Sequence, residues 1–346
     1  MNGEDPNLNS VNLVNADSLQ FIKTLPDSSV DLIATDPPYY RVKACKWDNQ
    51  WKSEEHYLSW LDELLSEFWR VLKPSGSLYM FCGSRLAADT ELLVRNRFDV
   101  LSHIVWAKPH GTWMRQNKES LRAFFPATER IIFAAHYAGP YKPQSNEWSE
   151  TRNRLKQNVF SPLISYFRVA RESLGVSSKA INEATGTSMA SHWFSGSQWQ
   201  LPGEKHYKQL QLLFEKIAAE KQQSSLLERG HSSLVDNWRI LDRDFRDLLK
   251  EHDYLRRPFS VTAKVPYTDV WTYAPVAFYH GKHPCEKPAE MMEHIIKTSS
   301  RPGDLVADFF MGSGATVKAA IKHGRRAIGV ELERDRFEQT SAEINT

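Results

Sequence analysis

The feature that most constrains the fold is an alternation of short apolar runs with amphipathic runs at both ends of the chain. Four runs rich in β-branched and aromatic residues have the length and composition of buried strands: 30–35, 77–82, 102–107 and 130–135. Two further strands are predicted at 304–310 and 326–332, and helical periodicity fills intervals at 56–72, 289–299 and 316–323. Strands that alternate with helices predict an α/β fold, here a Rossmann-like, doubly wound and mostly parallel sheet.

The middle of the chain breaks this alternation. Residues 138–265 open on a loop-like segment, continue with helical periodicity and contain no clear series of strands. The C-terminal stretch has too few strands to bury a core of its own. We therefore expect residues 1–137 and 266–346 to form one domain, with a mainly helical region inserted at 138–265.

The composition excludes several classes of protein. Hydrophobic residues make up 41% of the chain and charged residues 25%, which is ordinary for a globular protein. No apolar run reaches the roughly 18 residues of a membrane span, and the N-terminus has no apolar signal core, so we expect a cytoplasmic protein without a membrane partner. Cys45, Cys82 and Cys285 are far apart, which argues against a zinc site or a disulfide; we expect no metal and expect these cysteines to act as small packing residues.

The sharpest motif is Asp36-Pro37-Pro38-Tyr39, directly after the predicted strand 30–35. Open α/β sheets bind ligands at the carboxyl ends of their strands. Because proline has no N–H, the backbone here presents carbonyl acceptors, so that Asp36 and the Pro37 carbonyl can accept both hydrogens of one planar NH2 group. Such bonds favour a pyramidal nitrogen with a free lone pair and stabilise the positive charge that develops on it. Tyr39 offers a face for ring stacking. The alternative is a Pro-Pro turn with Asp36 as a local cap.

A second motif is the glycine turn at 308–316, where a strand runs into Gly312-Ser313-Gly314 and then a helix. Glycines let a ligand approach the backbone N–H groups at a helix N-terminus. The next strand ends in Glu331, in the position of an acid that binds ribose hydroxyls. Many such turns bind nothing, so this motif is weak by itself.

A third motif, 283–288, runs from His283 to Pro288 and directly precedes the helix predicted at 289–299. Pro288 suits the first position of that helix, and Lys287 could reach an anionic group there. A capped loop without a ligand is the alternative.

Together, in this order, the three motifs resemble the amino DNA methyltransferases of the β arrangement. In that family the D-P-P-Y motif comes first, the target-recognition region follows, and the glycine-rich cofactor motif comes last. The resemblance covers about 10–137 and 255–340, and its most specific segments are 14–40 and 283–320. It implies a methyltransferase-type Rossmann sheet, S-adenosylmethionine as cofactor, and methyl transfer to N6 of an adenine flipped out of double-stranded DNA. The enzyme would be an orphan methylase or half of a restriction–modification pair; a homodimer is compatible with the sequence.

The resemblance also implies roles for individual residues. It makes Asp36, Pro37, Pro38 and Tyr39 the catalytic set. Glycine-turn residues would hold the methionine moiety, Glu331 the ribose and Asp17 the adenine ring of the cofactor, while 283–288 would flank its carboxylate end. The full set expected to bind the cofactor is Asp17, His283, Lys287, Pro288, Asp308, Phe310, Gly312, Ser313, Gly314 and Glu331. Phe309 and Ala315 depart from the Pro and Thr that the family usually has, which could alter cofactor affinity.

Two alternatives to an adenine methyltransferase stay open. Relatives that act on cytosine N4 more often have Ser in place of Asp36, so cytosine is less favoured but remains the nearest alternative. Relatives that methylate a protein glutamine usually carry Asn there. A DNA-binding regulator whose methyltransferase domain is inactive is the alternative from another class.

The expected DNA interface lies in the inserted region. Its basic residues would contact phosphates: Arg152, Arg154, Lys156, Arg168, Arg171 and Lys179. Residues 168–196 faintly resemble a helix-turn-helix with 187–194 as the reading helix, although helix pairs joined by Gly are also common in cores. We expect Trp193 and Trp199 to be core residues, and 241–261 to be a charged surface helix.

Overall fold

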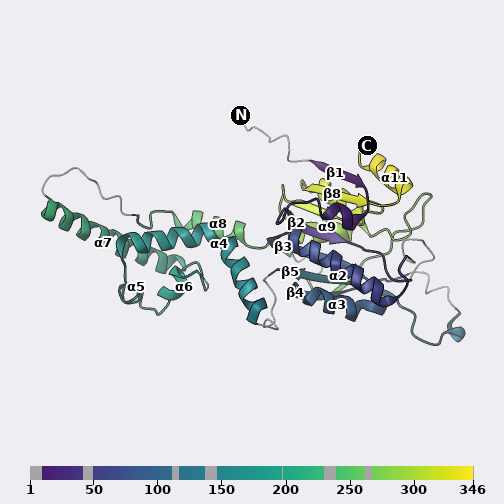
Figure 1. Cartoon of the computed structure of the whole chain (residues 1–346), viewed down its shortest axis with the longest axis horizontal. Helices are drawn as coiled ribbons and strands as arrows, with labels where there is room; N and C mark the ends of the chain where they lie inside the picture. Colours follow the sequence, from purple (N-terminus) through teal and green to yellow (C-terminus); the bar gives the residue numbers. More distant parts are fainter. Residues whose placement is uncertain are drawn as a thin grey trace. The chain divides into compact units, whose positions relative to one another are not determined.

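The computed structural model describes residues 10–41, 50–110, 117–136, 146–196, 198–229, 239–261 and 267–345. Contacts between residues divide the chain into two compact units, one formed by 1–142 together with 257–346 and the other by 143–256 (Figure 1). Cys45 lies outside the described residues. Among the described helices, none has both the length and the apolar character needed to cross a membrane.

The first unit is built on one eight-stranded sheet. Its strands, in spatial order, are β1 (Val11–Asn15), β8 (Arg326–Glu331), β7 (Leu305–Asp308), β2 (Val30–Thr35), β3 (Leu72–Cys82), β5 (Thr128–Ala135), β4 (Asp99–Ala107) and β6 (Val270–Thr272). Neighbouring strands are parallel except at β5, which runs antiparallel to both β3 and β4. The predicted mostly parallel α/β sheet is therefore confirmed.

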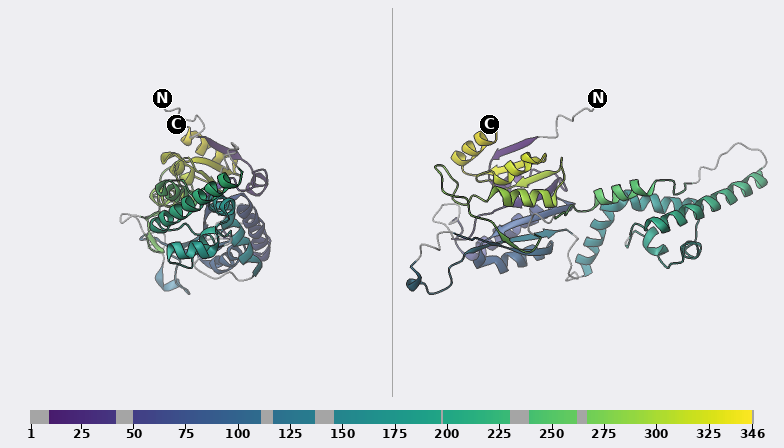
Figure 2. Two further views of the ribbon diagram at one scale, coloured as in Figure 1. Left: turned by 90° about the vertical axis from the view of Figure 1, so that its left-hand side faces the viewer. Right: turned by 180° about the vertical axis from the view of Figure 1, so that it is seen from behind.

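Helices cover both faces of this sheet, because the central strand β2 is apolar on both sides. Ile33 faces one core, which contains α2 (Glu54–Val71), α1 (Ser18–Ile22) and α3 (Ala87–Arg95). Leu32 and Ala34 face the other core, which contains α9 (Ala289–Ser299) and α10 (Ala315–Lys322). The yellow-green helices α9 and α10 are on the near side in the back view of Figure 2. The last helix is α11 (Arg334–Ile344), and the short 3-10 turns are Ser84–Leu86 and Lys118–Ser120.

The second unit contains only helices among its described regular elements. These are α4 (Asn146–Leu174), α5 (Ser178–Thr185), α6 (Ala190–Phe194), α7 (Glu204–Arg229) and α8 (Phe245–Leu255). They enclose a core of their own. Trp193 and Trp199 are both buried in it, as the sequence predicted.

Two expectations for this unit need correction. The reading helix predicted at 187–194 is only the single turn α6, because 186–189 form the turn after α5, with Gly186 in the left-handed region at φ +65°. The charged surface helix predicted at 241–261 is shorter, at 245–255. Its amphipathic pattern buries Leu248, and Leu241 before it, in the core, so this segment is more than a surface element.

Candidate active site

The three sequence motifs converge on one cavity. β8, β7 and β2 are parallel neighbours, so their carboxyl ends meet at one edge of the sheet. The D-P-P-Y motif follows β2, the glycine turn follows β7, and Glu331 ends β8. Expected site residues that line the cavity are Asp17, Asp36, Pro37, Pro38, Tyr39, His283, Lys287, Asp308, Phe310, Gly312, Ser313 and Glu331.

Two expected residues do not line the cavity. Pro288 is the N-cap of α9, one position before the first helical residue predicted for it. Gly314 is the N-cap of α10 in the left-handed region, at φ +73°, where a β-carbon would lie 2.8 Å from Cγ2 of Thr340. Both residues therefore shape the backbone that carries the lining residues.

Within the D-P-P-Y motif, the side chain of Tyr39 bonds to that of Asp36. The Tyr39 hydroxyl donates to Oδ1 of Asp36 at 2.6 Å. Burial, followed by the charges of Asp36 and Glu129, raises the pKa of Tyr39 well above its usual value, so the hydroxyl keeps its proton and is the donor. The bond fixes the Tyr39 ring beside the Asp36 carboxylate. Both residues belong to the motif that the sequence predicts to capture the base.

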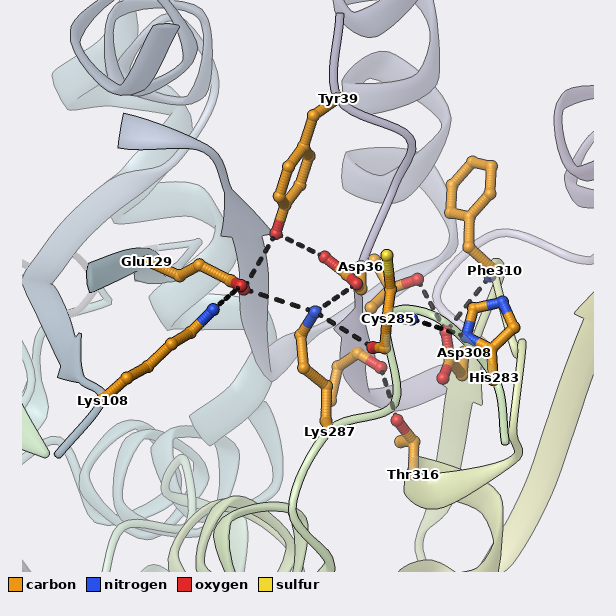
Figure 3. Close-up of polar contacts among 12 residues, drawn as sticks. Asp36, Tyr39, Lys108, Glu129, His283, Cys285, Lys287, Asp308, Phe310 and Thr316 are labelled. Atoms are coloured by element: carbon orange, nitrogen blue, oxygen red, sulfur yellow. Dashed lines mark hydrogen bonds and ion pairs between the residues drawn. The ribbon is translucent and has the colours of Figure 1, made fainter. Parts of the chain in front are cut away.

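Lys287 contacts the catalytic motif itself, a position that the sequence did not predict. Its Nζ donates to Oδ2 of Asp36 and lies 3.4 Å from Oε2 of Glu129, with the side chain only 8% exposed (Figure 3). On the far side, Nζ of Lys108 donates to Oε1 of Glu129. The expected role of Lys287 was at the carboxylate end of the cofactor; in this structure it joins two acidic side chains.

Sequence reasoning missed Glu129 and Lys108. Lys108 directly follows β4, and Glu129 is the second residue of β5. Because β5 is antiparallel, its beginning lies at the same edge as the end of β4, and Lys108 N donates to Ala127 O across this pair at 3.1 Å. The available signal was a charged residue at the end of one apolar strand and another at the start of the next, which points to the site only once the direction of β5 is known.

The charges of this site shift the pKa values of their neighbours. The groups concerned are Asp36, Lys287, Glu129 and Lys108. Burial raises the pKa of Asp36; Lys287 opposes this shift and Glu129 adds to it. Burial alone would lower the pKa of Lys287, but Asp36 and Glu129 outweigh it, so that pKa is raised. Burial alone would raise the pKa of Glu129, but Lys287 and Lys108 outweigh it and lower that pKa. Lys287 is therefore a charged ammonium ion shared by two carboxyl groups.

The glycine turn is held in place by acidic side chains. Gly312 N donates to Oε2 of Glu331 at 2.9 Å, and Glu333 N donates to Oε1 of Glu331 at 2.9 Å. Asp308 accepts from Thr35 Oγ1 at 2.8 Å and from Phe310 N at 3.1 Å. Burial raises the pKa of Asp308 to about 6 and also raises the pKa of Glu331.

Around this turn the side chains suit a ligand that carries both hydroxyl groups and apolar parts. Gly312 adopts φ +50°, and a β-carbon there would lie 3.0 Å from Cε1 of His283. Burial, followed by the charges of Arg336 and Lys287, lowers the pKa of His283 to about 4, so its imidazole is neutral near pH 7. Each oxygen of Glu331 keeps a second lone pair for a hydroxyl group. Phe310, Met311 and Leu332 add apolar surface to the same cavity.

The two departures from the family pattern have different surroundings. Phe309 is fully buried, its ring stacks on Phe68 at 5.3 Å between centroids, and its carbonyl accepts from Ser18 Oγ. Its side chain therefore belongs to the core. Ala315 is the first residue of α10 and lines the cavity with a methyl group where the family usually has the hydroxyl of Thr; the neighbouring Ser313 and Thr316 bring hydroxyl groups to the same cavity.

Comparison with known proteins identifies the family. The model of the DNA methylase family N6_N4_Mtase matches residues 30–342. The chain belongs to this family. It is a DNA methyltransferase, membership of this family makes S-adenosylmethionine its cofactor, and the resemblance found in the sequence is confirmed.

Several members of the family are similar along most of their length. DNA adenine methyltransferase YhdJ of Escherichia coli (strain K12) is 24% identical over 92% of this chain and 78% of its own. Type II methyltransferase M.BglII of Bacillus subtilis is 24% identical over 93% of this chain and 66% of its own. Among solved structures, the PvuII DNA methyltransferase (cytosine-N4-specific) shares the fold with a TM-score of 0.51, at 15% identity over 98% of this chain and 88% of its own.

The basic residues expected to meet DNA do not form one cluster in this methyltransferase. Arg154 and Lys156 are exposed on α4, about 21 Å and about 18 Å along the helix from Arg168 at 1.5 Å per residue. Arg171 donates to Val176 O at 3.0 Å and to Ser178 Oγ at 2.9 Å, so it ties α4 to α5. Two of the set make exposed intrahelical pairs, Arg168 with Glu172 and Lys179 with Glu183. The side chain of Arg152 lies outside the described part of the chain.

Proposed function

We propose that this methyltransferase acts on N6 of adenine in double-stranded DNA. One observation carries the proposal: Asp36 and Pro37 line the same cavity as the glycine turn that follows β7. An amine held by Asp36 is therefore in the cavity that the cofactor-binding residues share. Asp at this position favours adenine, and the similarity to a relative named as an adenine methyltransferase supports the choice.

The catalytic residues would act on the target amine. Each oxygen of Asp36 already accepts one bond, from Tyr39 or Lys287, and keeps a further lone pair for an amine hydrogen. The Pro37 carbonyl would accept the second hydrogen, which localises the nitrogen lone pair for attack. S-adenosylmethionine, when bound, supplies an electrophilic methyl group. Because burial raises the pKa of Asp36, its carboxylate is a better acceptor for the proton that the methylated amine must lose.

We further infer which parts of the chain catalyse methyl transfer and which recognise DNA. The catalytic domain expected at 1–137 and 266–346 corresponds to the unit of 1–142 and 257–346, and the region expected at 138–265, which corresponds to the unit of 143–256, recognises the DNA target. The base would be flipped into the cavity and stacked on Tyr39, which offsets the few kcal/mol that unstacking costs. The basic residues of α4 and α5 supply phosphate contacts that weaken with salt.

The product identifies the target base. The protein is incubated with labelled S-adenosylmethionine and unmethylated DNA, and the DNA is digested to nucleosides. We expect N6-methyladenine as the labelled product. N4-methylcytosine as the sole product would replace the proposal with its nearest alternative, and DNA binding without incorporation of label would favour an inactive regulator.

A further inference from the structure

Three charged groups stand in a row across the catalytic end of the cavity. Nζ of Lys287 donates to Asp36 on one side and lies 3.4 Å from Oε2 of Glu129 on the other (Figure 3). Lys287 is 8% exposed and Glu129 19% exposed, and all three residues line the cavity. Along this row, the acceptor Asp36 is followed by the donor Lys287 and then by the acceptor Glu129.

Glu129 is fixed at the end of this row by more than Lys287. Nζ of Lys108, a residue that does not line the cavity, donates to the other carboxylate oxygen, Oε1. The same ammonium group lies 4.6 Å from the ring centroid of Trp106. The Tyr39 hydroxyl lies 3.5 Å from Oε2. A carboxylate that is held from two sides cannot turn away from a base at low cost.

The edge of a nucleobase presents its own row of groups. In adenine the amine is followed by the ring acceptor N1 and then by a C–H group. In cytosine the amine is followed by the ring acceptor N3 and then by the carbonyl oxygen O2. With the amine on Asp36, the Lys287 ammonium beside that carboxylate would donate to the ring nitrogen, and Glu129 is the next group along. A carboxylate at that position faces C–H in adenine and another acceptor in cytosine.

We propose that Glu129 selects adenine by excluding the O2 oxygen of cytosine, while Lys287 donates to the ring nitrogen of the flipped base. This inference rests on the proposed function. Two acceptors with no donor between them repel each other and lose their hydration when the base enters the cavity. One unfavourable contact of this kind corresponds to a discrimination of roughly 10- to 100-fold.

The test changes the charge and hydrogen bonding of Glu129 at constant shape. The methylated positions are first mapped in DNA that the wild-type enzyme has modified. Duplexes are then made with adenine or cytosine at the mapped position, paired in each case, and kcat/KM is measured for both. In Glu129→Gln the amide can donate to O2, so we expect the cytosine-to-adenine ratio of kcat/KM to rise about 10- to 100-fold.

Glu293→Gln is the matched control. Glu293 is an ion-paired glutamate with a similar exposure of 16%, on α9 of the same unit, and it does not line the cavity. We expect the cytosine-to-adenine ratio of kcat/KM in this variant to equal that of the wild type. Glu129→Asp retains the negative charge and is expected to keep most of the preference for adenine.

If Glu129→Gln has no measurable turnover, its affinity for DNA tests the proposal instead. The affinity of Glu129→Gln for the two duplexes is measured with S-adenosylhomocysteine in place of the methyl donor, and the same rise in the relative affinity for cytosine is expected. An unchanged ratio in both measurements would overturn the role of Glu129 while leaving adenine methylation intact. Wild-type enzyme that methylates only cytosine would instead overturn the proposed function, and this inference with it.

Discussion

The backbone N–H of Gly312 donates to Oε2 of Glu331 at 2.9 Å, which joins the glycine turn after β7 to the end of the neighbouring strand β8. Glu333 N holds the second oxygen of the same carboxylate. Glu331 therefore fixes the turn and also lines the cavity, where the sequence predicts that it binds ribose hydroxyls.

This double role predicts the effect of Glu331→Ala. The substitution removes the bond to Gly312 and the acceptors for the ribose hydroxyls, so we expect S-adenosylmethionine to bind about 10- to 100-fold more weakly, the equivalent of one or two lost hydrogen bonds to a charged group. Isothermal titration calorimetry measures the affinity. Glu338→Ala, at an exposed site on α11, is the control and should bind like the wild type.

Gly312→Ala tests the close approach of the turn to His283. The left-handed φ of +50° and the 3.0 Å distance from the added β-carbon to Cε1 of His283 both oppose a side chain here. We expect a loss of about 1–2 kcal/mol in the free energy of unfolding, together with weaker cofactor binding. Gly203→Ala is the control, since its β-carbon would meet nothing within 4 Å. If Gly312→Ala were as stable and bound the cofactor as tightly as the wild type, the turn would not be constrained in this way.

Asp308 predicts a pH dependence of stability. Burial raises its pKa from 3.8 in the unfolded chain to about 6 in the folded protein, so between these values the folded state binds the extra proton. The contribution of Asp308 to stability is therefore present at low pH and lost as the pH rises from about 4 to about 6, with an upper limit of about 3 kcal/mol. Asp308→Asn removes this titration. Chemical denaturation at pH 4 and pH 7 should find that the variant gains stability relative to the wild type at the higher pH; a constant difference would contradict the shift.

Substitutions of Tyr39 separate its two contributions. Tyr39→Phe keeps the ring but removes the donor to Asp36 at 2.6 Å, so we expect slower methyl transfer with base capture retained. Tyr39→Ala also removes the stacking surface, which is worth about 1–3 kcal/mol per base. A fluorescent adenine analogue at the target position reports base capture. A strong loss of the signal in the Phe variant, equal to that of the Ala variant, would show that stacking is not what the ring supplies.

Much of the fold follows from local patterns in the sequence. The strands β2 and β7 and the helices α9 and α10 are short apolar or amphipathic segments with clear ends, and the parallel order of β8, β7 and β2 is what brings the motifs after them together. The edge strands β1 and β6 escaped prediction for different reasons: asparagines interrupt the apolar residues of β1, Val11–Asn15, and β6 has only three residues.

The acidic part of the base site could not be predicted from local patterns. Glu129 reaches the cavity only because β5 runs antiparallel between β3 and β4, and strand direction is set by long-range pairing that no local run of residues encodes. The position of Lys287 has a similar cause. The motif that carries it is local, but its partner Asp36 is 251 residues away, and burial of both charges makes their pairing necessary.

The central claim is that Asp36 acts on the amine of the target base and not on the cofactor. Single-turnover methyl transfer by Asp36→Asn, measured beside its affinity for S-adenosylmethionine, tests this claim most directly. We expect the rate to fall by at least about 100-fold, as for the loss of a preorganised electrostatic group, with cofactor affinity within a few-fold of the wild type. A rate that falls only in proportion to a loss of cofactor affinity would contradict the account.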